Sequence, residues 1–180
     1  YDVLRLSKGM TYKAAVSGLP MGGAKSVILT PSSDYQKTEA EAKAMGRFVD
    51  SFNGAYIAAE DVGVDTQFVD WMATKTKHVM GGETVSTGGD PSPWTAMGTF
   101  NGMKACLIHA GLGESFDGKV VAIQGIGSVG QNLCRLLTQA GAKVKVADIK
   151  QESVDFAVEE YGCTQVSNEE ILTTECDILA

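Results

Sequence analysis

The sequence predicts an α/β protein in which a smaller α/β domain precedes a doubly wound parallel sheet. Two observations favour this class. Apolar β-branched runs alternate with helical periodicity, most clearly over residues 119–148, where a helix separates two strands. The turn-forming run GGETVSTGGDPSP at 81–93 then divides the chain. We therefore expect domains over residues 1–85 and 86–180, of which the second contains an incomplete Rossmann-type sheet.

In the first domain, helix start and stop signals mark the elements. Thr38 and Glu41 have the spacing of a capping box, in which each side chain bonds the backbone of the other residue. Asp65 is placed to cap a further helix. Short apolar runs between the helices favour strands. We expect helices at 2–16, at 38–54 and after Asp65, and strands at 26–30 and 55–59.

In the second domain the pattern is strand, helix, strand, helix. β-branched residues are frequent in the run KVVAIQ, and a helical run separates it from KVKVAD. Three or four strands follow residue 118, whereas a doubly wound domain has about six. We therefore expect this sheet to be incomplete. The expected helices are 93–110, 131–142 and 151–161, and the expected strands are 119–124, 143–148 and the short runs TQV and CDILA.

Composition argues against several classes of partner. The chain has 180 residues, of which 44% are hydrophobic and 21% are charged, as in ordinary globular proteins. A net charge of −7 argues against nucleic-acid or anionic-membrane partners, which clustered Lys and Arg usually bind. No apolar run approaches the roughly 18 residues of a membrane span. The four dispersed cysteines form no C-x-x-C pair, so we expect reduced thiols, no metal site and a cytoplasmic protein.

The hexapeptide GIGSVG follows a predicted strand and opens a predicted helix. In such a motif Gly125 permits the tight turn, Gly127 lets the backbone approach a pyrophosphate, and Gly130 allows the helix to pack closely on the strand. Ser128 and Val129 lie at the start of that helix, where free N–H groups and the helix dipole favour phosphate. We expect these five residues to bind a dinucleotide. The alternative is a glycine turn that binds nothing.

Asp148 ends the next predicted strand, 18 residues past Gly130. A carboxylate about 20 residues beyond the glycines binds the hydroxyls of the adenosine ribose in such motifs. Its charge would repel a 2′-phosphate, which favours NAD over NADP as the cofactor. Lys150 lies nearby and keeps NADP as a minor alternative. The structural alternative for Asp148 is a solvated strand end.

Two lysines lie in the otherwise small and apolar stretch GMTYKAAVSGLPMGGAK. Leu6, Met10 and Lys13 fall within about a 60° arc of the predicted helix, so we expect Lys13 to project on its apolar side. Lys25 follows a pair of glycines and precedes a predicted strand. Either the apolar parts of both side chains are covered by the protein while the ammonium groups reach water, or the ammonium groups face a ligand.

Five segments in this order, GMTYK, GGAK, AAEDVG, GDPSPWTA and GIGSVG, resemble those of the Glu/Leu/Phe/Val dehydrogenases. These enzymes are NAD(P)-dependent amino-acid dehydrogenases. The resemblance covers essentially the whole chain and is nearest to the leucine branch, because GDPSPWTA is similar to the N-P-S-P-x-T-A of that branch. The resemblance implies that this chain, like the family, forms homo-oligomers. Members of the family also extend past both ends of this sequence, so the resemblance implies a fragment that lacks both ends.

The resemblance implies a role for each candidate residue. Lys13 would bind the substrate α-carboxylate, Lys25 would be the catalytic lysine, and Asp61 would take part in proton transfer at the amino group. Ala59 matches an alanine associated with branched-chain pockets. Thr95 matches a threonine that hydrogen-bonds the nicotinamide amide. The alternative for Thr95 is an ordinary helix-start hydroxyl.

The implied reaction is the NAD-dependent oxidative deamination of a branched-chain L-amino acid to a 2-oxo acid and ammonia. Lys25 must be neutral to activate water, and burial or a neighbouring positive charge favours the neutral state of a lysine. Two alternatives stay open. One is a phenylalanine or glutamate dehydrogenase of the same family, and the other is a catalytically inactive dinucleotide-binding fragment.

Overall fold

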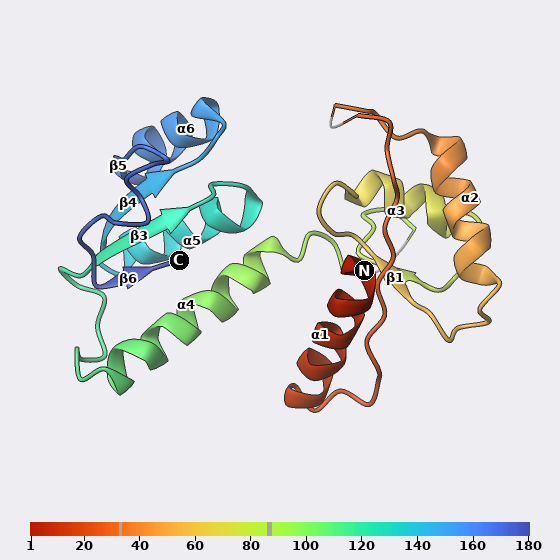
Figure 1. Cartoon of the computed structure of the whole chain (residues 1–180), viewed down its shortest axis with the longest axis horizontal. Coiled ribbons are helices and arrows are strands. Elements are labelled where there is room, and N and C mark those ends of the chain that lie inside the picture. Colours follow the sequence, from red (N-terminus) through yellow and green to blue (C-terminus); the bar gives the residue numbers. More distant parts are fainter. Residues whose placement is uncertain (33, 86–87) are drawn as a thin grey trace. The chain divides into compact units, whose positions relative to one another are not determined.

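The computed structural model describes residues 1–32, 34–85 and 88–180 of the chain (Figure 1). The chain divides into two compact units, Tyr1–Asp90 and Pro91–Ala180, and each has its own apolar core. The domain boundary expected between residues 85 and 86 falls beside Ser86, which lies outside the described residues.

The described part of the first unit combines helices with a two-stranded parallel sheet. Its elements are α1 (Asp2–Val16), α2 (Glu39–Asp50), β1 (Ala58–Ala59), α3 (Thr66–Ala73) and β2 (Val79–Met80). Strands β1 and β2 pair in parallel, and α3 connects them as a crossover helix. Helices α2 and α3 pack against each other. The buried residues between these elements are Ala42, Val49, Ala58, Phe68, Val69, Met72 and Val79.

The capping signals of the first unit mark the helix starts correctly. The Thr38 hydroxyl accepts the Glu41 N–H at 3.3 Å, and the Glu41 carboxylate accepts the Thr38 N–H at 2.7 Å, so the expected capping box is confirmed. The Asp65 carboxylate accepts the N–H of Phe68 at 2.9 Å at the start of α3, as expected. Helix α2 ends at Asp50, four residues earlier than the predicted end.

The strand expected at 26–30 is wrong. This segment forms no ladder with any described residue, and Val27 and Leu29 are 59% and 90% exposed. An apolar run becomes a strand only where a neighbouring strand receives its backbone hydrogen bonds, and pattern alone does not supply that neighbour. The strand expected at 55–59 is confined to Ala58–Ala59.

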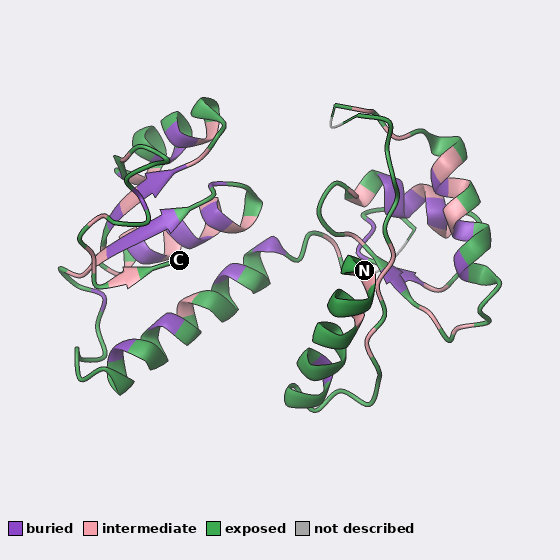
Figure 2. Ribbon diagram, in the orientation of Figure 1, coloured by how far each residue is buried: buried purple, intermediate pink, exposed green. Residues whose placement is uncertain are grey.

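Helix α1 has the predicted bounds but is exposed along most of its length (Figure 2). It buries Ala14 and half-buries Val3 and Ser7. Leu6 and Met10 are exposed, and Lys13 is exposed with them. The stripe expected to face the body of the protein is therefore open to solvent in the described residues.

The second unit is a parallel α/β sheet. Its elements are α4 (Ser92–His109), β3 (Val120–Gln124), α5 (Ser128–Gln139), β4 (Lys143–Ala147), α6 (Gln151–Tyr161), β5 (Thr164–Gln165) and β6 (Ile178–Leu179). The strand order is β5-β4-β3-β6, and all three pairings are parallel. The predicted doubly wound topology is confirmed, because the chain builds outward from β3 through β5 and then returns to the other side of β3. The strand order therefore reverses beside the carboxyl end of β3.

The two faces of this sheet are packed differently. One face of β3 and β4 packs against the helices and forms the main core of the unit. The strands contribute Val121, Ile123, Val144 and Val146 to this core, and the helices contribute Leu107, Leu133 and Leu137. Ala122 and Ala147 point to the opposite face and pack with Ile171. Figure 2 shows β3 and β4 as the most continuously buried part of the unit. None of the helices in the described residues is long and apolar enough to cross a membrane.

Candidate active site

The glycine loop between β3 and α5 has the tight turn that its sequence predicts. Gly125 has φ +99°, a conformation that side chains other than glycine rarely adopt. Its N–H donates to the Ala147 carbonyl at 2.8 Å, so the start of the loop is held against the end of the neighbouring strand β4. Because this turn lies where the strand order reverses, it occupies the position at which parallel α/β sheets bind ligands.

Gly130 brings helix α5 onto this turn. A Cβ at position 130 would overlap the Gly125 carbonyl oxygen and lie 3.1 Å from the Gly125 carbonyl carbon. Gly127 precedes α5 as its N-cap residue, and a Cβ there would meet no atom within 4 Å. No side-chain cap on α5 is found in the described residues, so the N–H groups of its first turn, which includes Ser128 and Val129, are not taken by a capping side chain.

Asp148 lies directly against the glycine loop. Its Oδ2 accepts the Ile126 N–H at 2.5 Å and its Oδ1 accepts the Lys150 N–H at 2.8 Å. These backbone hydrogen bonds, from Lys150 first and Ile126 second, lower the pKa of Asp148 below the usual value of an aspartate. The carboxylate is thus ionised at neutral pH and sits beside the end of β3.

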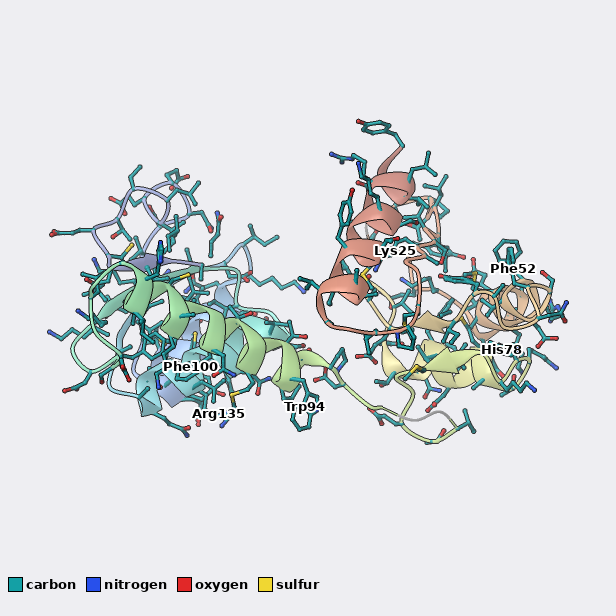
Figure 3. The ribbon with its side chains drawn as sticks, turned by 90° about the horizontal axis from the view of Figure 1, so that it is seen from below. Lys25, Phe52, His78, Trp94, Phe100 and Arg135 are labelled. Carbon is teal, nitrogen blue, oxygen red and sulfur yellow. The ribbon has the colours of Figure 1, made fainter. Side chains whose placement is uncertain are left out.

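In the first unit, Lys25 and Asp61 form an ion pair between Nζ and Oδ2, although they are 36 residues apart in the sequence. The side chain of Lys25 is 25% exposed and that of Asp61 is 47% exposed, so solvent reaches the pair. Lys25 lies in the extended segment that follows α1 (Figure 3). The hydroxyls of the next residue, Ser26, and of Tyr56 are 2.7 Å apart. The segment is therefore held beside the chain that leads into β1.

A tight turn presents Asp61 to Lys25. The backbones of Asp61 and Val64 exchange hydrogen bonds of 3.2 and 2.7 Å, and Gly63 between them has φ +73°. The Asp61 Oδ1 accepts the N–H of Val62 at 2.8 Å. One carboxylate oxygen is thus tied to the turn, and the other is left for Lys25.

The remaining candidates make no hydrogen bond or ion pair with Lys25 or Asp61 in the part of the chain that the structure describes. Lys13 is exposed on α1, and no ion pair with it is found in the described parts of the chain. Ala59 is exposed at the carboxyl end of β1, next to the buried Ala58. Thr95 is exposed in the first turn of α4, but Pro91 is the N-cap residue there, so Thr95 is not a capping hydroxyl.

Glu60, which immediately precedes Asp61, has unusual surroundings. Its Oε2 is buried and has no hydrogen-bond partner among the described residues. Burial, followed by the negative charges of Asp90, Asp65 and Glu83, raises the pKa of Glu60. The alternation of a strand end predicts the direction of this side chain, but no pattern in the sequence predicts which acidic groups gather around it.

Comparison with known proteins agrees with this division of the chain. Residues 1–78 match the dimerisation domain of the Glu/Leu/Phe/Val dehydrogenases. The resemblance to this family that the five motifs indicate is therefore confirmed. Residues 103–180 match the NAD-binding domain of the D-isomer specific 2-hydroxyacid dehydrogenases, which is a Rossmann-type domain.

Curated relatives from this dehydrogenase family extend over nearly the whole chain. Leucine dehydrogenase of Bacillus cereus is 46% identical over 181 residues, which cover 99% of this chain and 49% of the relative. L-tryptophan dehydrogenase of Nostoc punctiforme is 40% identical and valine dehydrogenase of Streptomyces virginiae is 38% identical, over 99% of this chain and 50% and 51% of those relatives. The chain thus spans about half the length of the curated relatives it matches.

Solved structures of this dehydrogenase family share the fold. The crystal structure of the Nostoc punctiforme L-tryptophan dehydrogenase superposes with a TM-score of 0.72 at 38% identity and covers 99% of this chain and 49% of that one. A hetero-hexameric glutamate dehydrogenase from Thermus thermophilus has a TM-score of 0.73 at 22% identity, with the same coverage of both chains.

Proposed function

We propose that the protein catalyses the NAD-dependent oxidative deamination of a branched-chain L-amino acid, which yields a 2-oxo acid and ammonia. The observation that carries this proposal is the contact between Lys25 and Asp61. An amine and a carboxylate in direct contact can exchange a proton, and deamination needs protons moved both at water and at the departing nitrogen. The leucine dehydrogenases of the same family, at 46% identity, support this substrate class.

In the proposed mechanism, NAD held by the second unit would supply the acceptor for the hydride of the substrate Cα, and loss of this hydride would leave the substrate as an imine. Lys13 binds the substrate carboxylate, because a fixed ammonium compensates an anion that leaves water. Lys25 takes a proton from the water that attacks the imine carbon. Asp61 passes protons to the nitrogen, which leaves as ammonia, and its contact with Lys25 provides the route between the two groups. Ala59 borders the pocket for the aliphatic side chain.

The glycine loop and Asp148 support the binding of NAD by the second unit. We infer that the backbone of Gly125, Gly127 and the first turn of α5 binds the pyrophosphate, with Gly130 holding the helix close. The ionised Asp148 would accept hydrogen bonds from the adenosine ribose hydroxyls. Its charge disfavours a 2′-phosphate, and this supports NAD over NADP. Thr95 would hydrogen-bond the nicotinamide amide.

The same proposal includes the domain roles and the setting of the protein. Residues 1–85 would bind the amino acid and residues 86–180 the cofactor, in a cytoplasmic homo-oligomer. The match of residues 1–78 to a dimerisation domain supports the oligomer. No nucleic-acid or membrane partner is proposed, in keeping with the net charge of −7.

A second candidate function is the deamination of an aromatic amino acid. The L-tryptophan dehydrogenase at 40% identity favours it, since its identity to this chain is close to that of the leucine dehydrogenases. Both candidates use the same catalytic pair and differ in the side-chain pocket.

The deciding experiment measures NADH formation from NAD with leucine, valine, isoleucine, phenylalanine, tryptophan and glutamate, each supplied separately. It uses this chain and the longest form of the protein that contains it. Turnover of the aliphatic set supports the proposal, and turnover of the aromatic pair alone supports the second candidate. NADH binding by the longest form, with no turnover of any amino acid, would overturn both.

A further inference from the structure

One hydroxyl group joins the helix that carries Lys13 to the segment that carries Lys25. Thr11 lies on α1, and its Oγ1 donates to the Ser7 carbonyl at 3.0 Å. The same oxygen accepts the Gly23 N–H at 3.0 Å. A hydroxyl carries a single proton, so its direction is fixed: the proton serves Ser7 and a lone pair receives Gly23.

Gly23 approaches α1 so closely that only glycine fits. A Cβ at position 23 would overlap the Thr11 nitrogen and the Ser7 carbonyl oxygen, and it would lie 2.6 Å from the Met10 carbonyl carbon. These atoms belong to the helix backbone and cannot move aside cheaply. The neighbouring Gly22 has no atom within 4 Å of its ideal Cβ. The requirement for glycine is therefore specific to position 23 and arises from contact.

This junction lies two residues before each lysine. Thr11 precedes Lys13 by two residues on the helix, and Gly23 precedes Lys25 by two residues on the extended segment. Beyond Gly23, the segment is held by the hydroxyl contact of Ser26 and by the ion pair of Lys25. The contact at Thr11 is thus the fixed point that relates the Lys25 segment to the helix that carries Lys13.

We propose that Thr11 and Gly23 are positioning residues, which hold the Lys25 ammonium at a set place relative to Lys13 on one side and Asp61 on the other. This inference rests on the proposed function, because it assigns the junction to the two lysines of that site. Neither residue touches the reacting atoms. A proton-transfer group that moves by about 1 Å loses much of its rate, so a loose junction lowers turnover more than substrate binding.

The test compares Thr11→Val, which removes the hydroxyl at nearly constant volume, with Thr11→Ser, which keeps it. Thr99→Val is the matched control, because the Thr99 hydroxyl donates to the Thr95 carbonyl at 3.0 Å in the same helical geometry and lies on α4. Hydrogen exchange of the Gly23 amide is measured in this chain. The values of kcat and KM, with the pH profile of kcat, are measured in the longest active form.

We expect Thr11→Val to speed exchange of the Gly23 amide by about tenfold and to lower kcat by about tenfold, with KM changed less. Thr11→Ser keeps the Gly23 exchange rate and kcat at their wild-type values, and Thr99→Val leaves both unchanged as well. If Thr11→Val does not fold, Thr11→Ala serves in its place. Gly23→Ala should push the Lys25 segment away from α1 and speed amide exchange in that segment, whereas Gly22→Ala should leave the exchange rates unchanged.

Two results overturn the proposal. One is a Gly23 exchange rate and a kcat in Thr11→Val that equal those of the wild type. The other is a Thr11→Ser variant as slow as Thr11→Val, which would assign the effect to the methyl group. A wild type that turns over no amino acid refutes the proposed function instead, while the Gly23 exchange rate still reports on the junction.

Discussion

The Asp148 carboxylate and the Ile126 backbone N–H, which lie 22 residues apart in the sequence, are joined by a hydrogen bond of 2.5 Å. This bond ties the end of β4 to the glycine loop after β3. The other oxygen of Asp148 accepts the Lys150 N–H, so backbone donors hold both oxygens. The negative charge of Asp148 is therefore fixed beside the glycine loop.

Asp148→Asn should change the choice between NADH and NADPH. The variant keeps an oxygen acceptor but loses the charge that repels a 2′-phosphate, so we expect the ratio of NADPH to NADH affinity to rise by about tenfold. Fluorescence titration with each cofactor measures this ratio. Asp155→Asn on α6 removes a similar charge elsewhere in the unit and serves as the control. An unchanged ratio in Asp148→Asn would argue against contact with the ribose.

Lys25→Met should abolish turnover. The thioether cannot take a proton from water, so we expect kcat to fall by at least about a thousandfold while NADH binding in the second unit is unchanged. Steady-state kinetics and a cofactor titration check both parts. Lys43→Met is the matched control, because Lys43 also pairs with a carboxylate, that of Glu39, but on the surface of α2. Turnover of Lys25→Met at the wild-type rate would show that the assignment is wrong.

Glu60→Gln should stabilise the protein at neutral pH. Because the folded state raises the pKa of Glu60, the folded chain binds its proton more tightly than the unfolded chain does. The wild type therefore loses free energy of unfolding as the pH rises from about 4.5 through the raised pKa. Gln carries no charge and removes that loss.

The thermal midpoint of Glu60→Gln should therefore exceed that of the wild type at pH 7 and equal it near pH 4. Melting curves across this range test the sign. Glu160→Gln, at an exposed position on α6, should show no such pH-dependent difference. A lower midpoint for Glu60→Gln at pH 7 would contradict the prediction.

Asp70→Asn should release the chain that follows β2. The carboxylate of Asp70 accepts hydrogen bonds from the N–H groups of Thr84 and Val85 and from the Thr84 hydroxyl, at 2.8 to 3.2 Å. Burial alone would raise the pKa of Asp70, but these hydrogen bonds lower it. Asn is neutral and has one oxygen, so we expect the amides of Thr84 and Val85 to exchange roughly tenfold faster.

Hydrogen exchange resolved to single residues measures this effect. Asp50→Asn, at the exposed end of α2, is the control and should leave both amides unchanged. Slow exchange of Thr84 and Val85 in Asp70→Asn would mean that other contacts hold the segment.

The sequence predicts the elements that carry their own signals. Thr38 and Asp65 mark helix starts through hydrogen bonds within a single turn. The glycine loop needs a positive φ at position 125, which glycine adopts readily. Features that depend on distant partners escape such reasoning. The segment 26–30 has the residues of a strand but no described strand pairs with it, and β2 is too short to show a period.

The same distinction applies within the site. Nothing in the spacing of Lys25 and Asp61 predicts that their side chains touch, because the contact depends on how the Asp61 turn packs beside the extended segment. The acceptor role of Asp70 is equally hidden, since a single acidic residue in a helix usually faces water. The resemblance implies roles for Lys25 and Asp61, whereas the partners of all three side chains depend on packing.

The contact between Gly130 and the carbonyl of Gly125 makes mutations at these two positions epistatic. A side chain at 130 has to push that peptide away, and this changes the turn in which Gly125 has φ +99°. A side chain at 125 disturbs the same turn directly. Once either glycine is lost, the conformation that required the other is already gone, so a second substitution costs far less than it would alone. When the two glycines are substituted one after the other, the first substitution therefore causes nearly all of the loss of stability of the loop.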